Sequence, residues 1–389
     1  MEIGRKKVLE IITLANSAEA FIGDQFSFFQ QTGKYEMHLI CSPDDTIEDF
    51  VKRQGIHYMS VEICREFSIC KDIKAVIQIS RYIRKNHIDI IIAHYFPKAS
   101  MIANFANLLA GNKTKIMVAH GVLHDTMHGL LRQAVIWEQK FDVLFAKKVI
   151  CVSQSVARRR REDGIEKEEK QIILGSGSCN GVDTINKFNP DNFSQEEIDK
   201  LRKKYSISGN DFVVGFSGRL VRDKGVVELQ QAYQQLKNKL RIPVKLLIIG
   251  EAESRDAIPF NVLNSLRDDN MVIFTGEVPY SDIQKYYLLM NVLVLPSYRE
   301  GFPTVVLEAG AMGIPVVTTK STGCVDSIIE NKTGLFADIN PVSLCNQIQL
   351  FTNKSLANEM GHNARRHIQQ NYDHKVVREY MLRVLDEIS

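Results

Sequence analysis

The sequence predicts an α/β protein with two doubly wound parallel sheets, one in each of two domains. Three observations lead to this prediction. The chain of 389 residues is too long for a single hydrophobic core. Short apolar runs alternate with segments whose apolar residues recur at helical spacing, and this alternation stops at a polar stretch, residues 186–210, before starting again. Because strands that are linked through helices run parallel and are covered on both faces, each half should form its own layered sheet.

Seven apolar runs in the front half are expected to be strands, at residues 8–14, 35–41, 56–63, 88–93, 115–119, 149–152 and 172–174. Segments at helical spacing, such as 71–85, lie between them. The first run also resembles the apolar part of a signal peptide, because Arg5, Lys6 and Lys7 precede it. Glu10 interrupts the run, which favours a buried strand. No run approaches the roughly 20 residues that span a bilayer, so we expect no integral membrane segment.

The back half is expected to contain strands at residues 212–216, 244–249, 271–274, 292–295 and 316–318. We expect a front domain over residues 1–190 and a back domain over 208–371, joined by a hinge-bearing linker that includes a short helix. Residues 375–388 are amphipathic, and the pattern leaves their place open. Doubly wound sheets bind ligands outside the carboxyl ends of their strands, so residues that follow the strands are candidates for the functional site.

Composition and charge exclude several classes of protein. The apolar content of 44% and charged content of 24% are those of an ordinary globular protein. The net charge of +3 is too small to indicate nucleic-acid binding. The seven cysteines are odd in number and include no C-x-x-C pair, so we expect neither a disulfide framework nor a zinc ribbon. A reducing cytoplasm is therefore the expected location.

The most informative segment runs from Glu300 to Glu308 (EGFPTVVLE), directly after an expected strand. Pro303 suits the first turn of a helix, and the residues that follow are apolar on nearly every side, so Glu308 should be buried. A carboxylate in that position is either stabilised by the helix dipole or accepts both ribose hydroxyls of a nucleotide. Gly301 favours the nucleotide, because it lets backbone amides approach an anion at the start of the helix.

A second segment, Gly215 to Gly225 (GFSGRLVRDKG), follows the first expected strand of the back half and precedes a helix with Asp223 as its expected N-cap. Arg219 offers a planar fork of donors and Lys224 a mobile point charge. Together they can neutralise a diphosphate. Surface charge is the other interpretation of such a pair, and the placement between strand and helix favours phosphate binding.

Three other signals have alternative explanations. His120, His124 and His128 would align as metal ligands on a helix, but Gly121 indicates that His120 lies in a loop. Glycines at 175 and 177 resemble a dinucleotide fingerprint without its spacing. The run 158–161 (RRRR) is either a solvated helix face or a contact with anionic lipid or an acceptor diphosphate.

Together these motifs resemble the retaining glycosyltransferases of family GT4, which have the two-domain GT-B fold. The subgroup that they resemble builds bacterial capsule, exopolysaccharide and lipid-linked oligosaccharide chains. The resemblance covers essentially the whole chain. It depends on Glu300 and Glu308 with the Gly-Phe-Pro insert, on Ser217-Gly218-Arg219 with Lys224, and in the front half on residues 88–100, 119–121, 149–153 and 177–183.

The resemblance implies a role for individual residues. His120, Glu300, Arg219 and Lys224 are the implied catalytic residues, with Arg219 and Lys224 on the donor diphosphate and His120 near the reacting carbon. Glu308 is implied to hold the ribose, and the backbone of Val278 to contact the base. The other implied donor-binding residues are Ser217, Gly218, Gly301, Phe302, Pro303 and Thr304. Weaker acceptor-side assignments fall on Asn16 and Ser17, because this chain has a single late glycine, Gly23, where many relatives have a Gly-Gly turn. His94 is either a third acceptor-side residue or a packed residue at the end of its strand. The family's C-terminal helix, here 372–389, crosses back onto the front domain.

The expected reaction moves a hexose or N-acetylhexosamine from a nucleotide diphosphate sugar, expected to be a UDP-sugar, to a glycan acceptor that is lipid-linked. No Asp-x-Asp occurs in the chain, so we expect neither a metal nor another cofactor, and positive side chains should stabilise the leaving group instead. The expected partners are the donor, the acceptor and an anionic membrane surface, with no nucleic acid. A nucleotide-sugar epimerase on the same fold is the alternative enzyme, and a catalytically idle binding protein is the other alternative.

Overall fold

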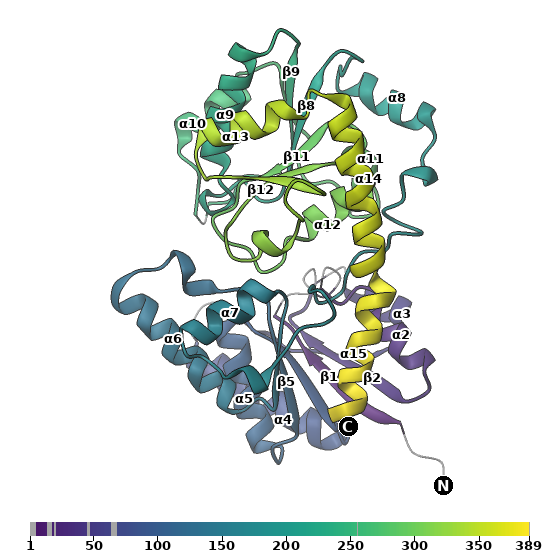
Figure 1. Ribbon diagram of the computed structural model, residues 1–389. Helices are drawn as coiled ribbons and strands as arrows, with labels where there is room; N and C mark the ends of the chain where they lie inside the picture. The colour runs from purple at the N-terminus through teal and green to yellow at the C-terminus, as the bar shows by residue number, and fades with distance from the viewer. Residues whose placement is uncertain are drawn as a thin grey trace. The chain divides into compact units, whose positions relative to one another are not determined.

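The computed structural model describes residues 5–13, 18, 21–44, 47–63, 68–254 and 256–388. The chain divides into two compact units. The front unit comprises Met1–Asn180 and Val376–Ser389, and the back unit comprises Gly181–Lys375. Each unit contains one parallel sheet with helices on both faces (Figure 1). The predicted fold class is therefore confirmed in both halves.

The front unit is built on a seven-stranded sheet with the order β3-β2-β1-β4-β5-β6-β7. Every neighbouring pair is parallel. All seven strands lie at the runs that the sequence predicts. They are β1 (Lys6–Ile11), β2 (Tyr35–Cys41), β3 (His57–Ser60), β4 (Ile90–His94), β5 (Thr114–Ala119), β6 (Lys148–Cys151) and β7 (Gln171–Ile172).

Seven α-helices of the described residues cover this sheet. They are α2 (Gln25–Gln31), α3 (Ile47–Gln54), α4 (Ile69–Lys85), α5 (Pro97–Leu109), α6 (Gly129–Leu144), α7 (Gln154–Glu162) and α15 (His374–Ile388), the last of which enters the unit at Val376. Helices α4 and α5 pack on the face that carries Leu9, Ile40 and Ile91. Helix α15 is anchored to the sheet by Tyr35, whose hydroxyl donates to Asp386 Oδ1 at 2.7 Å.

A buried polar network lies beneath α6 and α7. The Arg160 guanidinium is fully buried, donates to both oxygens of the Glu166 carboxylate at 2.8 and 2.7 Å, and also donates to Gln139. Arg159 pairs with Asp125 at 2.7 Å, and Arg161 donates to Gln171 at 2.6 Å. In the basic run 158–161, Arg160 is therefore buried, Arg159 and Arg161 are partly exposed and paired with side chains of the unit, and Arg158 is exposed.

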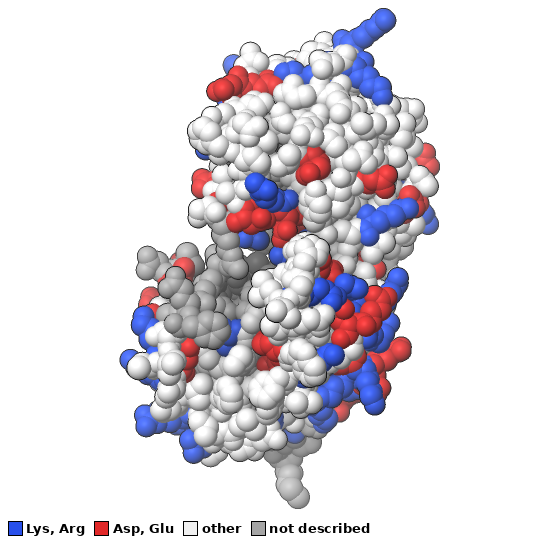
Figure 2. Space-filling model, turned by 90° about the vertical axis from the view of Figure 1, so that its left-hand side faces the viewer, with Lys and Arg blue, Asp and Glu red and all other residues white. Residues whose placement is uncertain are grey.

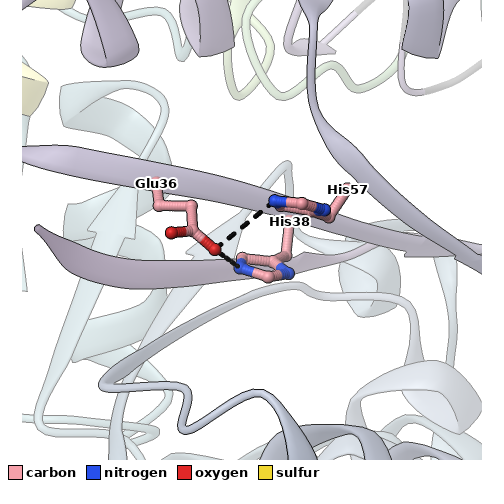
Figure 3. Close-up of side chains that lie close together, drawn as sticks. All are labelled: Glu36, His38 and His57. Atoms are coloured by element: carbon pink, nitrogen blue, oxygen red, sulfur yellow. Dashed lines mark hydrogen bonds and ion pairs between the residues drawn. The ribbon is translucent and has the colours of Figure 1, made fainter.

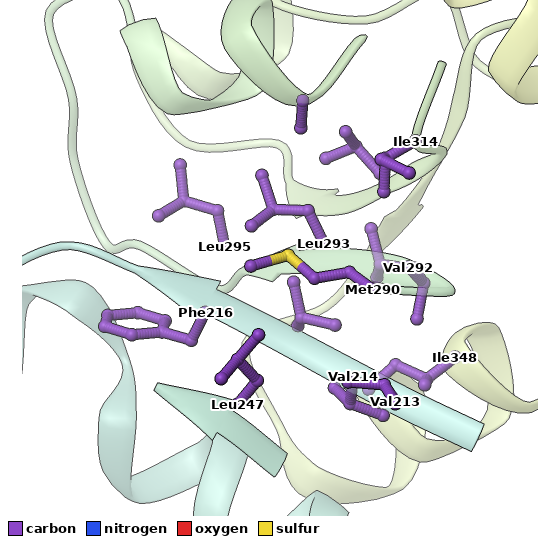
Figure 4. Close-up of a cluster of buried hydrophobic side chains, with 14 of the residues drawn as sticks. Val213, Val214, Phe216, Leu247, Met290, Val292, Leu293, Leu295, Ile314 and Ile348 are labelled. Atoms are coloured by element: carbon purple, nitrogen blue, oxygen red, sulfur yellow. The ribbon is translucent and has the colours of Figure 1, made fainter. Parts of the chain in front are cut away.

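The back unit is built on a six-stranded parallel sheet with the order β10-β9-β8-β11-β12-β13. Its strands are β8 (Phe212–Ser217), β9 (Val244–Ile249), β10 (Val272–Phe274), β11 (Val292–Leu295), β12 (Val316–Thr319) and β13 (Gly334–Ala337). The sequence predicts the first five. The edge strand β13 has four residues, Gly-Leu-Phe-Ala, and its pattern is too short to indicate a strand. Side chains of β8, β9 and β11 interdigitate in one core with residues such as Ile314 and Ile348 (Figure 4).

The polar stretch 186–210 belongs to the back unit. Its short helix α8 (Gln195–Lys204) starts with a complete capping box, in which Ser194 and Glu197 exchange hydrogen bonds. Phe188, Ile198 and Ile207 are buried in the core of the back unit. These apolar anchors explain why the unit begins at Gly181 rather than at the expected position 208. The remaining helices are α9 (Val226–Lys239), α10 (Phe260–Arg267), α11 (Ile283–Tyr287), α12 (Thr304–Ala311), α13 (Pro341–Leu350) and α14 (Lys354–Asn371).

Among the described residues, no helix combines the length and the apolar character that a membrane crossing requires.

Replacement of Arg160 by Ala should lower the free energy of unfolding by about 3–5 kcal/mol, because it leaves the buried Glu166 carboxylate without its partner. Arg158, the exposed member of the same run, provides the matched control, and Arg158→Ala should stay within about 0.5 kcal/mol of wild type. Urea unfolding followed by circular dichroism measures both. Equal effects of the two substitutions would contradict the buried network.

Candidate active site

Backbone hydrogen bonds connect the loops that follow β8, β9 and β10 at the carboxyl edge of the back sheet. The Gly218 amide donates to Ile249 O at 2.9 Å, and the Gly250 amide donates to Gly276 O at 3.0 Å. The Leu220 amide donates to Glu251 O at 2.9 Å. The predicted donor residues Ser217 and Gly218 therefore lie on the same edge as the loop that leads from Gly276 to Val278.

The loop after β8 is also fixed to the loop after β11. Arg299 Nη2 lies 2.6 Å from Asp223 Oδ2, and the Tyr298 amide donates to Asp223 O at 2.8 Å. Gly225 adopts a left-handed conformation with φ 67°, and a Cβ on it would lie 2.1 Å from Pro296 O. Asp223 is therefore not the N-cap of α9 that the sequence predicts. Gly225 is the N-cap, because the Asp223 carboxylate is occupied by Arg299.

The structure brings together Lys224 and Glu300, two of the residues with a predicted catalytic role. Lys224 Nζ donates to Glu300 Oε1, and Ser297 Oγ donates to the same oxygen at 2.8 Å. Both charged side chains are mostly buried. A cation and a carboxylate held this closely can bind a polar, negatively charged ligand, with Lys224 on a phosphate and Glu300 on sugar hydroxyls.

The segment between Glu300 and α12 is held against the loop that follows β12. The Glu300 amide donates to Thr322 O at 2.9 Å. Gly323 has φ 81°, and a Cβ there would lie 2.5 Å from the carbonyl oxygens of both Glu300 and Gly301. Helix α12 begins at Thr304 with Pro303 as its N-cap, as the sequence predicts to within one residue, and Phe302 packs against the core. The amides at the start of α12 therefore lie directly after Glu300 in the chain.

Glu308 is buried, with 4% of its surface exposed, as predicted. Tyr287, which is fully buried, donates its hydroxyl to Glu308 Oε2 at 2.6 Å, and Tyr280 donates a second hydrogen bond to the carboxylate. Burial raises the pKa of the Glu308 carboxyl above its usual range. Tyr280 is partly exposed, whereas Tyr287 is fully buried, and the Lys187 ammonium lies 3.0 Å from the centroid of the Tyr280 ring.

Arg219 is 62% exposed, and its Nη1 lies 3.0 Å from Glu253 Oε2. Its guanidinium is thus at the surface of the same loop, paired with an exposed carboxylate. Surface ion pairs of this kind contribute little to stability, so a diphosphate can replace Glu253 as the partner of Arg219.

In the front unit, a chain of hydrogen bonds leads to His120. Glu10 Oε2 lies 2.9 Å from His94 Nε2, and His94 Nδ1 lies 2.7 Å from His120 Nε2. The three residues come from the carboxyl ends of β1, β4 and β5. The Phe21 ring covers the His120 ring at a centroid distance of 4.2 Å. His120 follows its strand in a loop, as Gly121 indicates.

These contacts give one consistent assignment of the ring protons of both histidines. The Glu10 carboxylate accepts from His94 Nε2, so His94 Nδ1 carries no proton and accepts from His120 Nε2. His120 Nδ1 is then left with a lone pair. Burial, followed by the neighbouring His94, lowers the pKa of His120 well below its usual value, which keeps this ring neutral. His120 can therefore accept a hydrogen bond from a hydroxyl group.

The other predicted histidines lie elsewhere. His124 is buried between Asp163 and Gln139, and His128 is the exposed N-cap of α6, so the three histidines do not align as metal ligands. The weak acceptor-side residues Asn16 and Ser17 lie outside the described residues.

Sequence reasoning missed several residues of the candidate site. In the sequence, Glu10 stands out only as a charged residue in an apolar strand. Gly323 is recognisable only as a glycine that follows a strand. Glu253, Tyr280 and Tyr287 carry no local signal, because their contacts with Arg219 and Glu308 join distant parts of the chain.

Both units match models of known protein families, and these matches identify the class of enzyme. Residues 197–367 match the model described as "Glycosyl transferases group 1", and residues 29–184 match the model described as "Glycosyltransferase Family 4". The two matches cover the motifs of both units. The chain belongs to glycosyltransferase family 4.

Two curated relatives of this glycosyltransferase are bacterial enzymes that it matches over most of their length. It is 28% identical over 375 residues to the capsular polysaccharide biosynthesis glycosyltransferase CapM of Staphylococcus aureus, with 96% of this chain and 94% of CapM covered. It is 24% identical to an Escherichia coli enzyme named UDP-Gal:alpha-D-GlcNAc-diphosphoundecaprenol alpha-1,3-galactosyltransferase, with 86% and 84% covered.

Solved structures confirm the GT-B fold of the glycosyltransferase. The Anabaena HepE protein, solved in complex with UDP and glucose, superimposes with a TM-score of 0.78 at 19% identity, covering 98% of this chain and all of HepE. A Listeria monocytogenes protein described as a putative UDP-N-acetylglucosamine 2-epimerase also superimposes, with a TM-score of 0.67 at 12% identity over 99% and 97% of the two chains. The fold alone is therefore common to transferases and epimerases, and the family models make the distinction.

The raised pKa of Glu308 predicts how nucleotide binding depends on pH. As pH falls, this carboxyl takes up a proton before an ordinary glutamate does, and a protonated carboxyl no longer accepts two ribose hydroxyls. Binding of UDP should therefore weaken on going from pH 7.5 to pH 5 by a larger factor in wild type than in Glu308→Gln. At pH 7.5, Glu308→Gln itself should bind UDP about 1–3 kcal/mol more weakly. Calorimetry at both pH values measures this difference. Because UDP itself titrates equally in both experiments, comparison of wild type with the variant removes that contribution. Identical pH profiles would remove Glu308 from the ribose site.

Proposed function

We propose that this glycosyltransferase moves a hexose or N-acetylhexosamine from a UDP-sugar to a lipid-linked bacterial oligosaccharide or polysaccharide, with retention at the anomeric carbon and without a metal ion. The observation that carries the proposal is the contact between Lys224 and Glu300 at the carboxyl edge of the back sheet. The names of the CapM and E. coli relatives, the second of which specifies a UDP-sugar and a diphosphoundecaprenol acceptor, support the substrate class.

The main requirement of this reaction is to stabilise the negative charge that develops on the leaving group. As the bond between the anomeric carbon and the diphosphate breaks, negative charge develops on the phosphate oxygens. Lys224 and Arg219, with the amides that open α12, are positioned on the loops that would meet this charge. The absence of an Asp-x-Asp pair from the sequence is the reason to assign the task to these groups.

The proposed step is a front-face substitution. The bond from the anomeric carbon to the phosphate oxygen breaks, and a bond to the acceptor hydroxyl oxygen forms on the same face of the sugar. The acceptor proton passes to the departing phosphate oxygen, so no protein base is needed. In the back unit, Glu300 holds the sugar hydroxyls. In the front unit, His120 offers its Nδ1 lone pair to a hydroxyl group, with Glu10 and His94 fixing the orientation of its ring.

A donor screen tests the proposal. Each common nucleotide sugar is incubated with a polyprenyl-diphosphate-linked sugar, and both nucleotide release and product are measured, with and without a chelator. We expect acceptor-dependent release that survives the chelator. Arg219→Ala should lose at least about a hundredfold in turnover, and Glu10→Gln should lower kcat more than it changes KM. Conversion of the donor sugar without release of nucleotide would show an epimerase. Loss of activity with chelator that Mn²⁺ or Mg²⁺ restores would overturn the metal-free mechanism.

The proposal also needs a surface that meets a lipid-linked acceptor, and helix α6 supplies one. Leu130, Trp137, Phe141 and Leu144 follow each other at helical spacing and are exposed, Trp137 by 68%. Exposed apolar residues of α5, Phe105, Leu108 and Leu109, extend the patch. Figure 2, which faces the side that carries α6, shows a broad uncharged area there with charged atoms along its margins. Lys140 lies 5.3 Å above the Trp137 ring, a combination typical of membrane interfaces.

We therefore predict peripheral docking through α6 at the cytoplasmic face of the membrane. The double variant Leu130→Gln, Trp137→Gln should lose binding to vesicles that contain anionic lipid, because apolar burial and the contribution of nearby lysines, about 1 kcal/mol each, are both required. Arg158→Gln is the matched control and should bind as wild type does. Co-sedimentation measures all three proteins. Unchanged binding by the double variant, or self-association through α6 without lipid binding, would contradict this surface assignment.

A further inference from the structure

The front sheet carries a second group of polar side chains, far from the carboxyl ends of its strands. Glu36 and His38 stand two residues apart on β2, and therefore on the same face of the sheet. His57 is the first residue of the edge strand β3 and is paired in register with His38. Figure 3 shows all three side chains converging, with one carboxylate oxygen of Glu36 facing both rings.

The distances within this group are those of ligands around a single metal ion. Glu36 Oε1 lies 3.0 Å from His38 Nε2 and 3.4 Å from His57 Nε2, and one potential ligand atom from each residue lies within 4.8 Å of the others. Tetrahedral zinc with bonds of about 2.0–2.1 Å separates its ligands by about 3.3 Å. The two imidazole rings are stacked at a centroid distance of 4.7 Å and 25°. To direct its nitrogen at the same ion, the His57 ring would have to turn out of this stack, and its exposure of 63% leaves room for that rotation.

One ligand is already held in place by a second contact. His38 is 1% exposed, and its Nδ1 lies 2.8 Å from the Tyr82 hydroxyl of α4. Without a metal, His38 Nε2–H donates to Glu36 and Nδ1 accepts from Tyr82. With a metal on Nε2, the proton lies on Nδ1 and is donated to the Tyr82 oxygen. A tyrosine hydroxyl serves both states, because it donates and accepts, and such a contact orients metal-bound histidines.

A positive charge already lies next to the carboxylate. Lys7 Nζ is 3.5 Å from Glu36 Oε1, and its side chain is 31% exposed. A divalent ion would displace this flexible ammonium toward solvent, since two imidazoles and a carboxylate are the ligands that zinc prefers and an ammonium offers no lone pair.

We propose that Glu36, His38 and His57 form a binding site for a divalent transition-metal ion of the zinc class, which joins the edge strand β3 to β2. Three protein ligands leave the fourth position to water. The site lies toward the amino-terminal ends of the strands, whereas the Glu10–His94–His120 chain lies at their carboxyl ends. Its role is accordingly to stabilise the sheet edge, and it is separate from the proposed transfer reaction.

Metal titration of protein without a histidine tag tests the site. After treatment with a chelator and dialysis, the protein is titrated with Co²⁺ and followed by visible absorption, and Zn²⁺ is then added in competition. We expect one ion per chain, displaced by zinc, and a Tm that rises by several degrees with Zn²⁺. His57→Gln, an exposed substitution, should lose both effects, and Tyr82→Phe should weaken binding roughly 10- to 100-fold. His128→Gln, at an exposed histidine of the same unit, is the matched control and should bind as wild type does.

Binding of zinc by His57→Gln with wild-type affinity, or the absence of stoichiometric binding by wild type, would overturn the site. The result does not depend on the donor screen, because neither absorption nor Tm measures transfer. If a chelator reduces transfer, the activity of His57→Gln separates two explanations. A similar loss of activity in this variant indicates that the metal acts by joining β3 to β2. Full activity in this variant indicates a metal at the reaction centre.

Discussion

The pairing of β8 with β11 brings Lys224 and Glu300, which are 76 residues apart in the chain, into direct contact. Parallel pairing ends both strands at the same edge, so the loops that follow them must meet there. The other contacts of the back-unit site build on that constraint. The Asp223–Arg299 ion pair, the close approach of Gly225 to Pro296 and the approach of Gly323 to Glu300 all join loops that leave neighbouring strands in the same direction. Without this arrangement, none of the charged side chains would face a common ligand.

Both units contain buried charged side chains. Their hydrogen-bond partners and their place in the fold distinguish those with a structural role from those that can contact a ligand. Arg160 and Glu166 pair with each other in the interior of the front unit, and Gln139 and Gln171 complete their hydrogen bonding. Glu308 is also buried, but one of its two hydrogen-bond donors is the exposed Tyr280. The chain from Glu10 through His94 ends on His120 at the carboxyl edge, where no other described residue hydrogen-bonds to its Nδ1. A buried polar group is thus a candidate for function when an exposed side chain takes part in its hydrogen bonding, or when it lies at the carboxyl edge of the sheet.

The carboxyl ends and the amino-terminal ends of the front-sheet strands also carry different polar groups. At the carboxyl edge, Glu10 and His94 lie at the ends of their strands, and His120 follows β5 in a loop. Toward the amino-terminal ends, Glu36, His38 and His57 project from the strands themselves, and His38 is fixed by α4 through Tyr82. Ligands held on regular strands change position little, which suits an ion that strengthens the short edge strand β3 more than it suits a reaction.

The sequence by itself determined the fold class, because continuous apolar runs separated by helical spacing have few structural solutions. It located all seven strands of the front sheet and five of the six in the back sheet. It also placed Arg219, Lys224 and Glu300 in segments that follow strands, and Glu308 on a buried helix. Local patterns carry this information. Only the tertiary structure decided which partners these residues meet. Glu10 and His94 are 84 residues apart, and Lys7, Glu36 and His57 lie on three separate strands. Whether Arg160 or Arg158 faces the interior depends on what packs against α7. Such contacts follow from strand order and register, which are set by the packing of the whole sheet and leave no trace in any one segment of the chain.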